Sequence, residues 1–119
     1  MQLMKKTKLH AMGILFGAVF SWFGLSVASA SCNPRGCTGQ ITRIYTKASG
    51  TVHIGTDQDE TQANCGEPNN VYFTIRPDAV ARDMFLAKLI SAQAQEKSLY
   101  IRIVESTSDC EVMYILMDN

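Results

Sequence analysis

The sequence predicts a small, mainly β domain that contains one helix. Beyond residue 30, most of the chain consists of short β-branched and aromatic runs that are separated by turn residues. The stretch 79–96 differs, because it is rich in Ala, Leu, Met, Gln and Lys and contains neither glycine nor proline. Three strand-type runs precede this stretch and two follow it, so the expected order of elements is β-β-β-α-β-β.

The first thirty residues have the form of a signal peptide. Lysines at positions 5, 6 and 8 precede an apolar run, Ala11–Val27, and Ala28-Ser29-Ala30 has the small-x-small form of a cleavage site. We therefore expect cleavage after Ala30 and one secreted or periplasmic domain over residues 31–119. A membrane-spanning helix is one alternative. A lipoprotein anchored at Cys32 is the other, although Ser29 stands where a leucine-like residue is usual.

The composition of residues 31–119 disfavours nucleic acid as a partner. Three of the 11 basic residues and none of the 11 acidic residues lie in the first thirty positions, so the formal net charge changes from 0 to −3 on cleavage. Binding to a phosphate backbone depends on clusters of lysine and arginine. We expect no nucleic-acid partner and, after cleavage, no membrane association.

All four cysteines lie beyond the cleavage site, which indicates two disulfides. Three connectivities are possible, and we favour Cys65–Cys110 with Cys32–Cys37. Zinc sites usually contain closely paired cysteines such as C-x2-C, whereas Cys32 and Cys37 have a C-x4-C spacing. The sequence therefore predicts a disulfide-stapled domain without a metal or other cofactor.

The individual elements follow from local patterns. Pro77 and Asp78 precede the helix, where proline and an acidic side chain are favoured, and Leu89 with its neighbours forms its core-facing stripe. The segment Ser31–Gly39 has turn-type residues and is expected to be a loop. Strands are expected at Gln40–Lys47, Thr51–Thr56, Val71–Ile75, Ser98–Glu105 and Cys110–Met117.

This order of elements is that of a five-stranded OB-type barrel with its helix between strands three and four. In that fold the third and fifth strands are parallel neighbours. The favoured Cys65–Cys110 bridge would join the starts of these two strands, which agrees with the layout. The alternative fold is an open antiparallel sheet with one packed helix.

The barrel interpretation predicts a candidate ligand-binding face on the first three strands. The side chains expected to point inward are Val52, Ile54, Val71, Phe73 and Ile75. The side chains expected on the outer face are Arg43, Tyr45, His53, Tyr72, Thr74 and Arg76. Aromatic rings beside hydrogen-bonding groups suit a sugar or a peptide, and an ordinary solvated sheet face is the alternative.

The helix has a second apolar stripe on the side away from the expected core. Ala87, Ile90 and Ala94 lie where a monomer would normally place charged residues, and the apolar last strand has the same character. This pattern predicts either a contact between subunits or surface apolarity without a function.

No set of residues typical of catalysis emerges. Asp57, Asp59 and Glu60 resemble the start of a calcium loop, but the glycine and the final glutamate of that motif are missing. His53 has no serine or cysteine nucleophile in a recognisable pattern. We therefore expect a protein that is not an enzyme.

From Gly39 to Met117 the layout resembles the binding subunits of AB5 toxins of the subtilase-cytotoxin and typhoid-toxin type. The passage Gln95–Ile103, which leaves the helix and enters the next strand, is similar to that of those subunits. The resemblance implies a ring of five OB-type domains that binds host glycans, and it carries over no glycan-contacting residue. Two candidate functions follow. The first is a non-enzymatic module that binds carbohydrate or a cell surface, either as a monomer or as an oligomer. The second is a monomeric periplasmic structural or inhibitor-type domain that contacts another protein.

Overall fold

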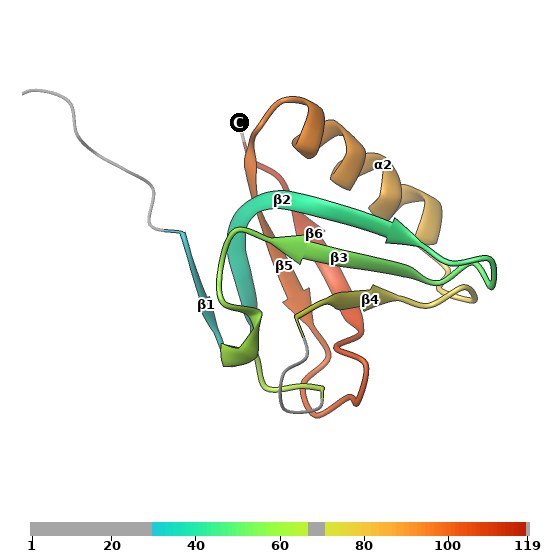
Figure 1. Cartoon of the computed structure of the whole chain (residues 1–119), viewed down its shortest axis with the longest axis horizontal. Coiled ribbons are helices and arrows are strands. Elements are labelled where there is room, and N and C mark those ends of the chain that lie inside the picture. Colours follow the sequence, from blue (N-terminus) through green and yellow to red (C-terminus); the bar gives the residue numbers. More distant parts are fainter. Residues whose placement is uncertain (1–29, 67–70, 119) are drawn as a thin grey trace, which may run out of the picture.

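The structure is a computed structural model that describes residues 30–66 and 71–118. Over these residues it is mainly β, with one α-helix that packs against the sheet (Figure 1). The predicted signal peptide lies outside the described residues, except for Ala30. The elements are β1 (Ser31–Asn33), β2 (Gly36–Thr46), β3 (Val52–Thr56), the 3-10 helix η3 (Glu60–Gln62), β4 (Phe73–Ile75), α2 (Arg82–Ala94), β5 (Ser98–Ile103) and β6 (Val112–Leu116). None of the helices among these residues has the length and apolarity needed to cross a membrane.

The strands pair antiparallel in the order β4-β3-β2-β5-β6, and β1 also pairs with β2. The two ends of this sheet meet at one isolated parallel bridge, between Thr74 and Glu111, beside a 2.9 Å hydrogen bond from Thr74 N–H to the Cys110 carbonyl. A single bridge does not make a ladder, so the sheet is not closed. The predicted OB-type barrel is therefore not confirmed, and the structure has the unclosed antiparallel sheet with one packed helix that the alternative describes.

Strand β2 belongs to both halves of the sheet. Its first part, Gly36–Gln40, pairs with β5, and its second part, Ile41–Thr46, pairs with β3. The strand curves strongly between these parts (Figure 1). The pairing with β3 shifts register between Ile41 and Arg43, which is the signature of a β-bulge, and bulges bend the strand that carries them.

The prediction that Ser31–Gly39 is a loop is wrong, because this segment forms the β1–β2 hairpin. Cys32 and Cys37 are directly paired across the hairpin, where their disulfide joins the two strands. A side chain at Gly36 would place its Cβ 1.9 Å from the Ile101 carbonyl oxygen, so only glycine permits β2 to approach β5 so closely. Both predicted disulfides, Cys32–Cys37 and Cys65–Cys110, are present.

The core lies between the sheet and α2. Leu89 and Ala92 of α2 are fully buried. The helix begins at Arg82 rather than at Ala79, because the preceding residues form tight turns held by hydrogen bonds between residues three apart. Buried side chains of the sheet include Val52, Ile54, Phe73, Ile75, Ile101, Ile103 and Ile115.

Four of the five side chains predicted to point inward from the second and third expected strands are buried. The exception is Val71, which is 46% exposed. Strand β4 begins only at Phe73, so Val71 precedes the paired backbone that would hold it over the core.

Candidate functional site

Three aromatic rings form a row across the outer face of β2, β3 and the segment before β4. Tyr45 and His53 are direct partners in the β2–β3 register. Their ring centroids lie 5.6 Å apart in a stacked arrangement, and the His53 and Tyr72 centroids lie 6.0 Å apart at a tilt. Tyr45 is 47% exposed. This row, Tyr45–His53–Tyr72, brings three of the predicted outer residues together.

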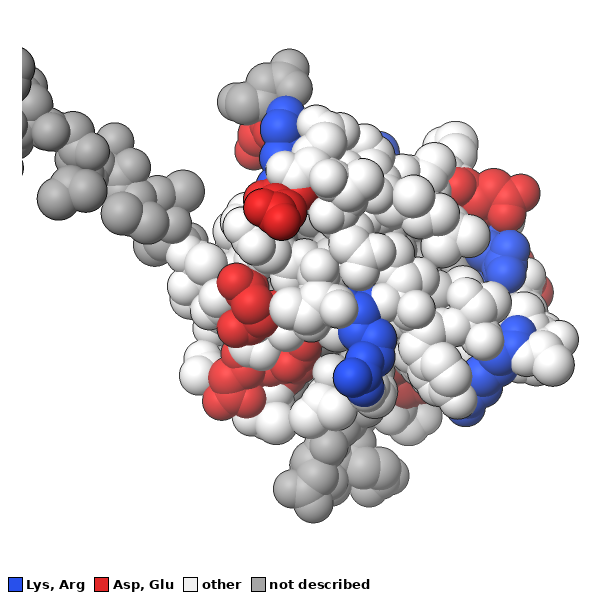
Figure 2. Space-filling view, turned by 45° about the horizontal axis from the view of Figure 1, so that its top comes forward, with Lys and Arg blue, Asp and Glu red and all other residues white. Residues whose placement is uncertain are grey.

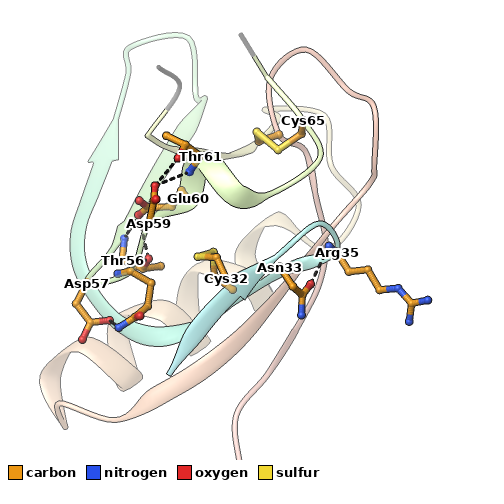
Figure 3. The surroundings of a disulfide bond; sticks show 12 residues. Cys32, Asn33, Arg35, Thr56, Asp57, Asp59, Glu60, Thr61 and Cys65 are labelled. Atoms are coloured by element: carbon orange, nitrogen blue, oxygen red, sulfur yellow. Dashed lines mark hydrogen bonds between the residues drawn. A yellow bond between two sulfur atoms is a disulfide. The ribbon is translucent and has the colours of Figure 1, made fainter. Parts of the chain in front are cut away.

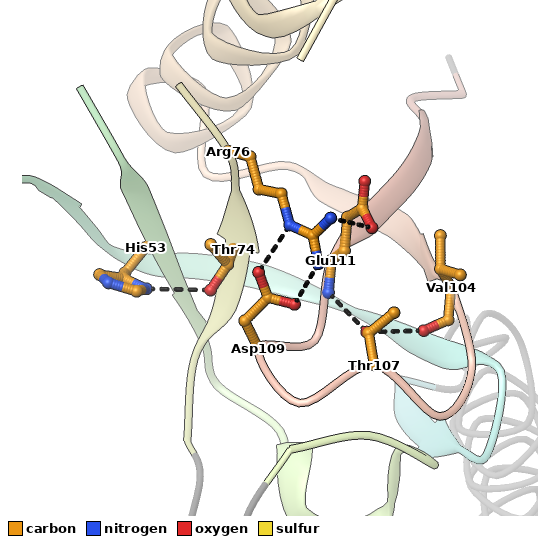
Figure 4. A network of polar contacts seen from close by, with 7 residues as sticks. All are labelled: His53, Thr74, Arg76, Val104, Thr107, Asp109 and Glu111. Atoms are coloured by element: carbon orange, nitrogen blue, oxygen red, sulfur yellow. Dashed lines mark hydrogen bonds and ion pairs between the residues drawn. The ribbon is translucent and has the colours of Figure 1, made fainter. Parts of the chain in front are cut away.

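The environment of His53 favours its neutral form. Burial is the main cause of its lowered pKa, and the positive charge of Lys47 acts in the same direction, against a weaker effect of Asp109. His53 Nδ1 lies 3.1 Å from the hydroxyl of Thr74 (Figure 4). The centre of the aromatic row is therefore an uncharged ring, held in place by a hydrogen bond from β4.

A hollow of about 220 Å³ lies beside this row. One wall is formed by Arg43 and Tyr72, whose side chains are joined by a 2.8 Å hydrogen bond from Arg43 Nη1 to the Tyr72 hydroxyl. Gly55 contributes bare backbone between these two side chains. The residues that line the hollow are Thr42, Arg43, Gly55, Thr56, Glu60, Val71 and Tyr72.

The bulge in β2 explains why neighbouring residues line the same hollow. Successive side chains of a regular strand point to opposite faces. Ile41 nevertheless faces the core, whereas both Thr42 and Arg43 are exposed and line the hollow. Because a bulge inserts one extra residue against its partner strand, it re-aims the side chains that follow.

Glu60 is the buried carboxyl group of the hollow, with a relative exposure of only 9%. Its Oε1 accepts hydrogen bonds from the Thr56 backbone N–H at 2.6 Å and from the Thr56 hydroxyl at 2.9 Å. The residue begins η3, where the neighbouring Asp59 caps the helix by accepting from the Thr61 N–H at 3.1 Å. Figure 3 shows this group of contacts close to the Cys32 disulfide.

Thr74 is buried, and Arg76, whose side chain is 43% exposed, is held by contacts with the loop before β6. Thr74 is only 4% exposed, so the expectation that it forms part of an accessible surface is wrong. Arg76 forms a two-point contact with Asp109, at 2.9 and 3.1 Å, and a 3.2 Å ion pair with Glu111 (Figure 4). The Arg76 hydrogen bond holds the pKa of Asp109 below its usual value. This network ties β4 to the loop before β6.

Acidic residues do not converge on a metal position in the described part of the chain. Asp57 accepts a 3.0 Å hydrogen bond from the Gln40 N–H, while Asp59 and Glu60 bond to Thr61 and Thr56. Figure 2 shows acidic side chains gathered on the left of the viewed face, whereas basic side chains lie scattered. An anionic polymer therefore finds no continuous basic surface on this face.

The outer side of α2 is exposed, as expected for a stripe that faces away from the core. Ala87, Ile90 and Ala94 are all exposed, Ile90 to 54%. Met84, on the same helix, is 67% exposed and extends this apolar surface.

The sequence thus located Arg43, Tyr45, His53 and Tyr72, which the structure brings together, but it did not identify the other polar and glycine residues that line the hollow. Thr42, Gly55, Thr56 and Glu60 were missed. Glycine inside a strand pattern indicates a bulge or a close approach, and this signal was available at Gly55. No local pattern pointed to Glu60, because its sequence neighbours Asp57 and Asp59 gave the segment the character of an acidic loop.

Comparison of the chain with protein-family models, curated proteins and solved structures gives no match.

Proposed function

We propose that this protein is an exported, non-enzymatic binding module that recognises carbohydrate at a cell surface. The observation that carries the proposal is the hollow between Arg43 and Glu60 beside the Tyr45–His53–Tyr72 row. Two disulfides support export, because such bonds persist in oxidising compartments. We propose the signal peptide at residues 1–30 as the route to that compartment.

The chemistry of the face suits a sugar. Tyrosine presents a flat apolar ring together with a polar tip, so it contacts the C–H groups of a sugar and also bonds its hydroxyls. Arg43 supplies donors, and Glu60 supplies an acceptor. Sites for drug-sized ligands usually measure about 300–1,000 Å³. The smaller hollow of about 220 Å³ suits one terminal ring, with the aromatic row beside it for a second.

The strand order supports an OB-type architecture as part of the proposal. OB domains are partly open barrels that bind oligosaccharides on the face of their second and third strands. Here Thr74 of β4 and Glu111, which directly precedes β6, form a parallel bridge, and along the chain α2 lies between β4 and β5. The aromatic row would then occupy the usual ligand face.

Self-association through the outer side of α2 is a further part of the proposal. Ala87 and Ala94 are small enough for a close approach between helices, and the exposed side chains of Ile90 and Met84 would become buried. The resemblance to AB5 binding subunits leads to the same expectation. Light scattering on the purified protein tests it: a mass near five subunits supports the proposal, and a monomer refutes it.

The alternative is a monomeric periplasmic structural or inhibitor-type domain that contacts another protein. Exposed apolar side chains on β6 favour this candidate, since Met113 and Leu116 are 47% and 48% exposed. It predicts a monomer that is indifferent to glycans. The two candidates therefore give opposite results in one binding experiment.

A glycan array with the oxidised protein tests carbohydrate binding directly. We expect Tyr45→Ala and Tyr72→Ala to abolish binding to any glycan that the wild type retains. Tyr114→Ala is the matched control, because Tyr114 is 39% exposed on β6 and pairs with Tyr100 rather than with the aromatic row. Absence of binding to every glycan on the array, or equal loss in the Tyr114 variant, would refute the proposal.

A further inference from the structure

We infer that Glu60 and Gly55 select the ligand of the hollow, and that this ligand is one uncharged pyranose ring with hydroxyls on adjacent carbons. The inference rests on the proposed carbohydrate-binding function and specifies the class of sugar. In this arrangement Glu60 accepts a hydrogen bond from a sugar hydroxyl, Arg43 and Tyr72 contact the ring, and Gly55 leaves room for the ring between them.

Glu60 has an oxygen that its own chain does not use. Both hydrogen bonds from Thr56 go to Oε1. Oε2 makes no hydrogen bond or ion pair with another residue in the described part of the protein, although nine-tenths of Glu60 is buried. Among the described residues, Arg102 Nε is the only fully buried side-chain nitrogen or oxygen atom without a partner, so Oε2 of Glu60 is open to solvent and to a ligand. Since Glu60 lines the hollow, a ligand that brings a hydroxyl donor would satisfy this oxygen.

The charges around the hollow favour an uncharged ligand. Arg43 is the one basic side chain of the lining and Glu60 the one acidic side chain, so the two formal charges cancel. Arg43 forms no ion pair with any described residue. A carboxylate on the sugar would be attracted by Arg43 but repelled by Glu60, and the reverse holds for an ammonium group, so a charged group of either sign gains no net attraction. A hydroxyl both donates and accepts, so two adjacent hydroxyls match a lining with donors on one side and an acceptor on the other.

Gly55 keeps the floor of the hollow empty. An added Cβ would lie 3.4 Å from Arg43 Cβ and 3.5 Å from both Thr42 Oγ1 and Tyr72 Cε1. These are ordinary van der Waals contacts, so alanine fits without displacing the backbone. The same methyl group would occupy space between Arg43 and Tyr72 that the ring requires. Gly55→Ala is therefore a substitution that fills the site and preserves the sheet.

The test is an NMR titration of the ¹⁵N-labelled protein, purified from an oxidising compartment, with simple glycosides. The neutral probes are the methyl α-glycosides of glucose, galactose and mannose, and the charged probes are glucuronic acid and glucosamine. We expect at least one neutral probe to shift the amides of Gly55, Thr56 and Glu60 in a saturable way, with weaker effects from both charged probes.

Two variants and one control complete the test. Glu60→Gln keeps an oxygen for Thr56 but replaces the unused oxygen with a donor, so we expect about a tenfold to hundredfold weaker binding of the neutral probe. Gly55→Ala should abolish that binding. Glu105→Gln is the control with unchanged affinity, because Glu105 is an exposed glutamate that does not line the hollow. Unchanged amide spectra away from the hollow show that each variant is folded.

The outcomes separate this inference from the proposed function. If glycans bind on the array but the Glu60 and Gly55 variants bind as tightly as the wild type, the inference is overturned and the carbohydrate-binding function stands. Tighter binding of a charged probe than of every neutral one also overturns it. If neither the array nor any probe shows binding, the proposed function and the inference fall together.

Discussion

Replacing Cys65 and Cys110 together by alanine is expected to lower the free energy of unfolding by about 4 kcal/mol. The two residues are 45 positions apart, so the disulfide closes a loop that includes β4, α2 and β5. A cross-link restricts the unfolded chain more strongly when the loop is longer. The bond between Cys32 and Cys37, which are five positions apart, should contribute only about 2 kcal/mol on the same basis.

The folded structure should survive the loss of the longer bridge. Backbone hydrogen bonds join the same segments, from Gly66 N–H to the Thr107 carbonyl at 2.8 Å and from Ser106 N–H to the Asn64 carbonyl at 2.7 Å. Cys110 is only 2% exposed, and alanine is a small replacement that keeps this position apolar. The effect should therefore act mainly on the unfolded chain.

Urea unfolding followed by far-ultraviolet circular dichroism, without reductant, measures the two contributions. The Cys32→Ala/Cys37→Ala double variant is the matched control, because it removes a disulfide of the same chemistry that closes a much shorter loop. We expect the Cys65/Cys110 variant to lose about twice as much stability as this control. An equal or smaller loss would refute the argument from loop length.

Three further predictions concern single positions. Glu96→Gly should stabilise the protein by about 0.5–1 kcal/mol in urea unfolding, because Glu96 has a φ of 53° after the end of α2 and glycine adopts this conformation freely. Phe73→Ala should cost about 3–5 kcal/mol in the same assay, because the ring is fully buried. Burial lowers the pKa of the His53 imidazole in the folded protein, so on acidification the unfolded chain binds a proton at this imidazole at a higher pH than the folded protein does. The free energy of unfolding should therefore fall as the pH drops below about 6.5. His53→Gln should remove that part of the pH dependence, as measured by urea unfolding between pH 7 and pH 5.

Each of these predictions has a control and a result that would contradict it. Glu96→Ala keeps a side chain in the strained conformation and should not stabilise the protein; equal gains for alanine and glycine would argue against the role of φ. For Phe73, a loss as small as that of the exposed Val71→Ala would show that the β4 ring is not part of the core. For His53, an unchanged slope in the glutamine variant would assign the pH dependence to other groups.

Much of the candidate face could be predicted because it depends on local alternation. Tyr45 and His53 lie on regular strands, so the period of two placed their side chains correctly on the outer face. The same reasoning placed Ile54 and Phe73 inside. It was wrong for Val71, because the pattern of alternation does not show where hydrogen-bonded pairing begins.

Other parts of the site depend on contacts between distant segments. The bulge in β2 directs both Thr42 and Arg43 to the hollow, and it exists only relative to the register of β3. Arg76 was expected to be available to a ligand, but Asp109 and Glu111, more than thirty residues away, engage it. Whether a polar side chain is available therefore depends on its partners in space.

The sequence by itself determined the β-rich class, the position of the helix, the presence of two disulfides and the aromatic members of the outer face. These features depend on residue type, periodicity and spacing, which are local properties of the chain. Only the tertiary structure decided that the sheet stays unclosed, that β1 and β2 form a hairpin, and that Glu60 lines a hollow over Gly55. Those features depend on strand register and on close approaches between segments remote in sequence, which no local pattern encodes.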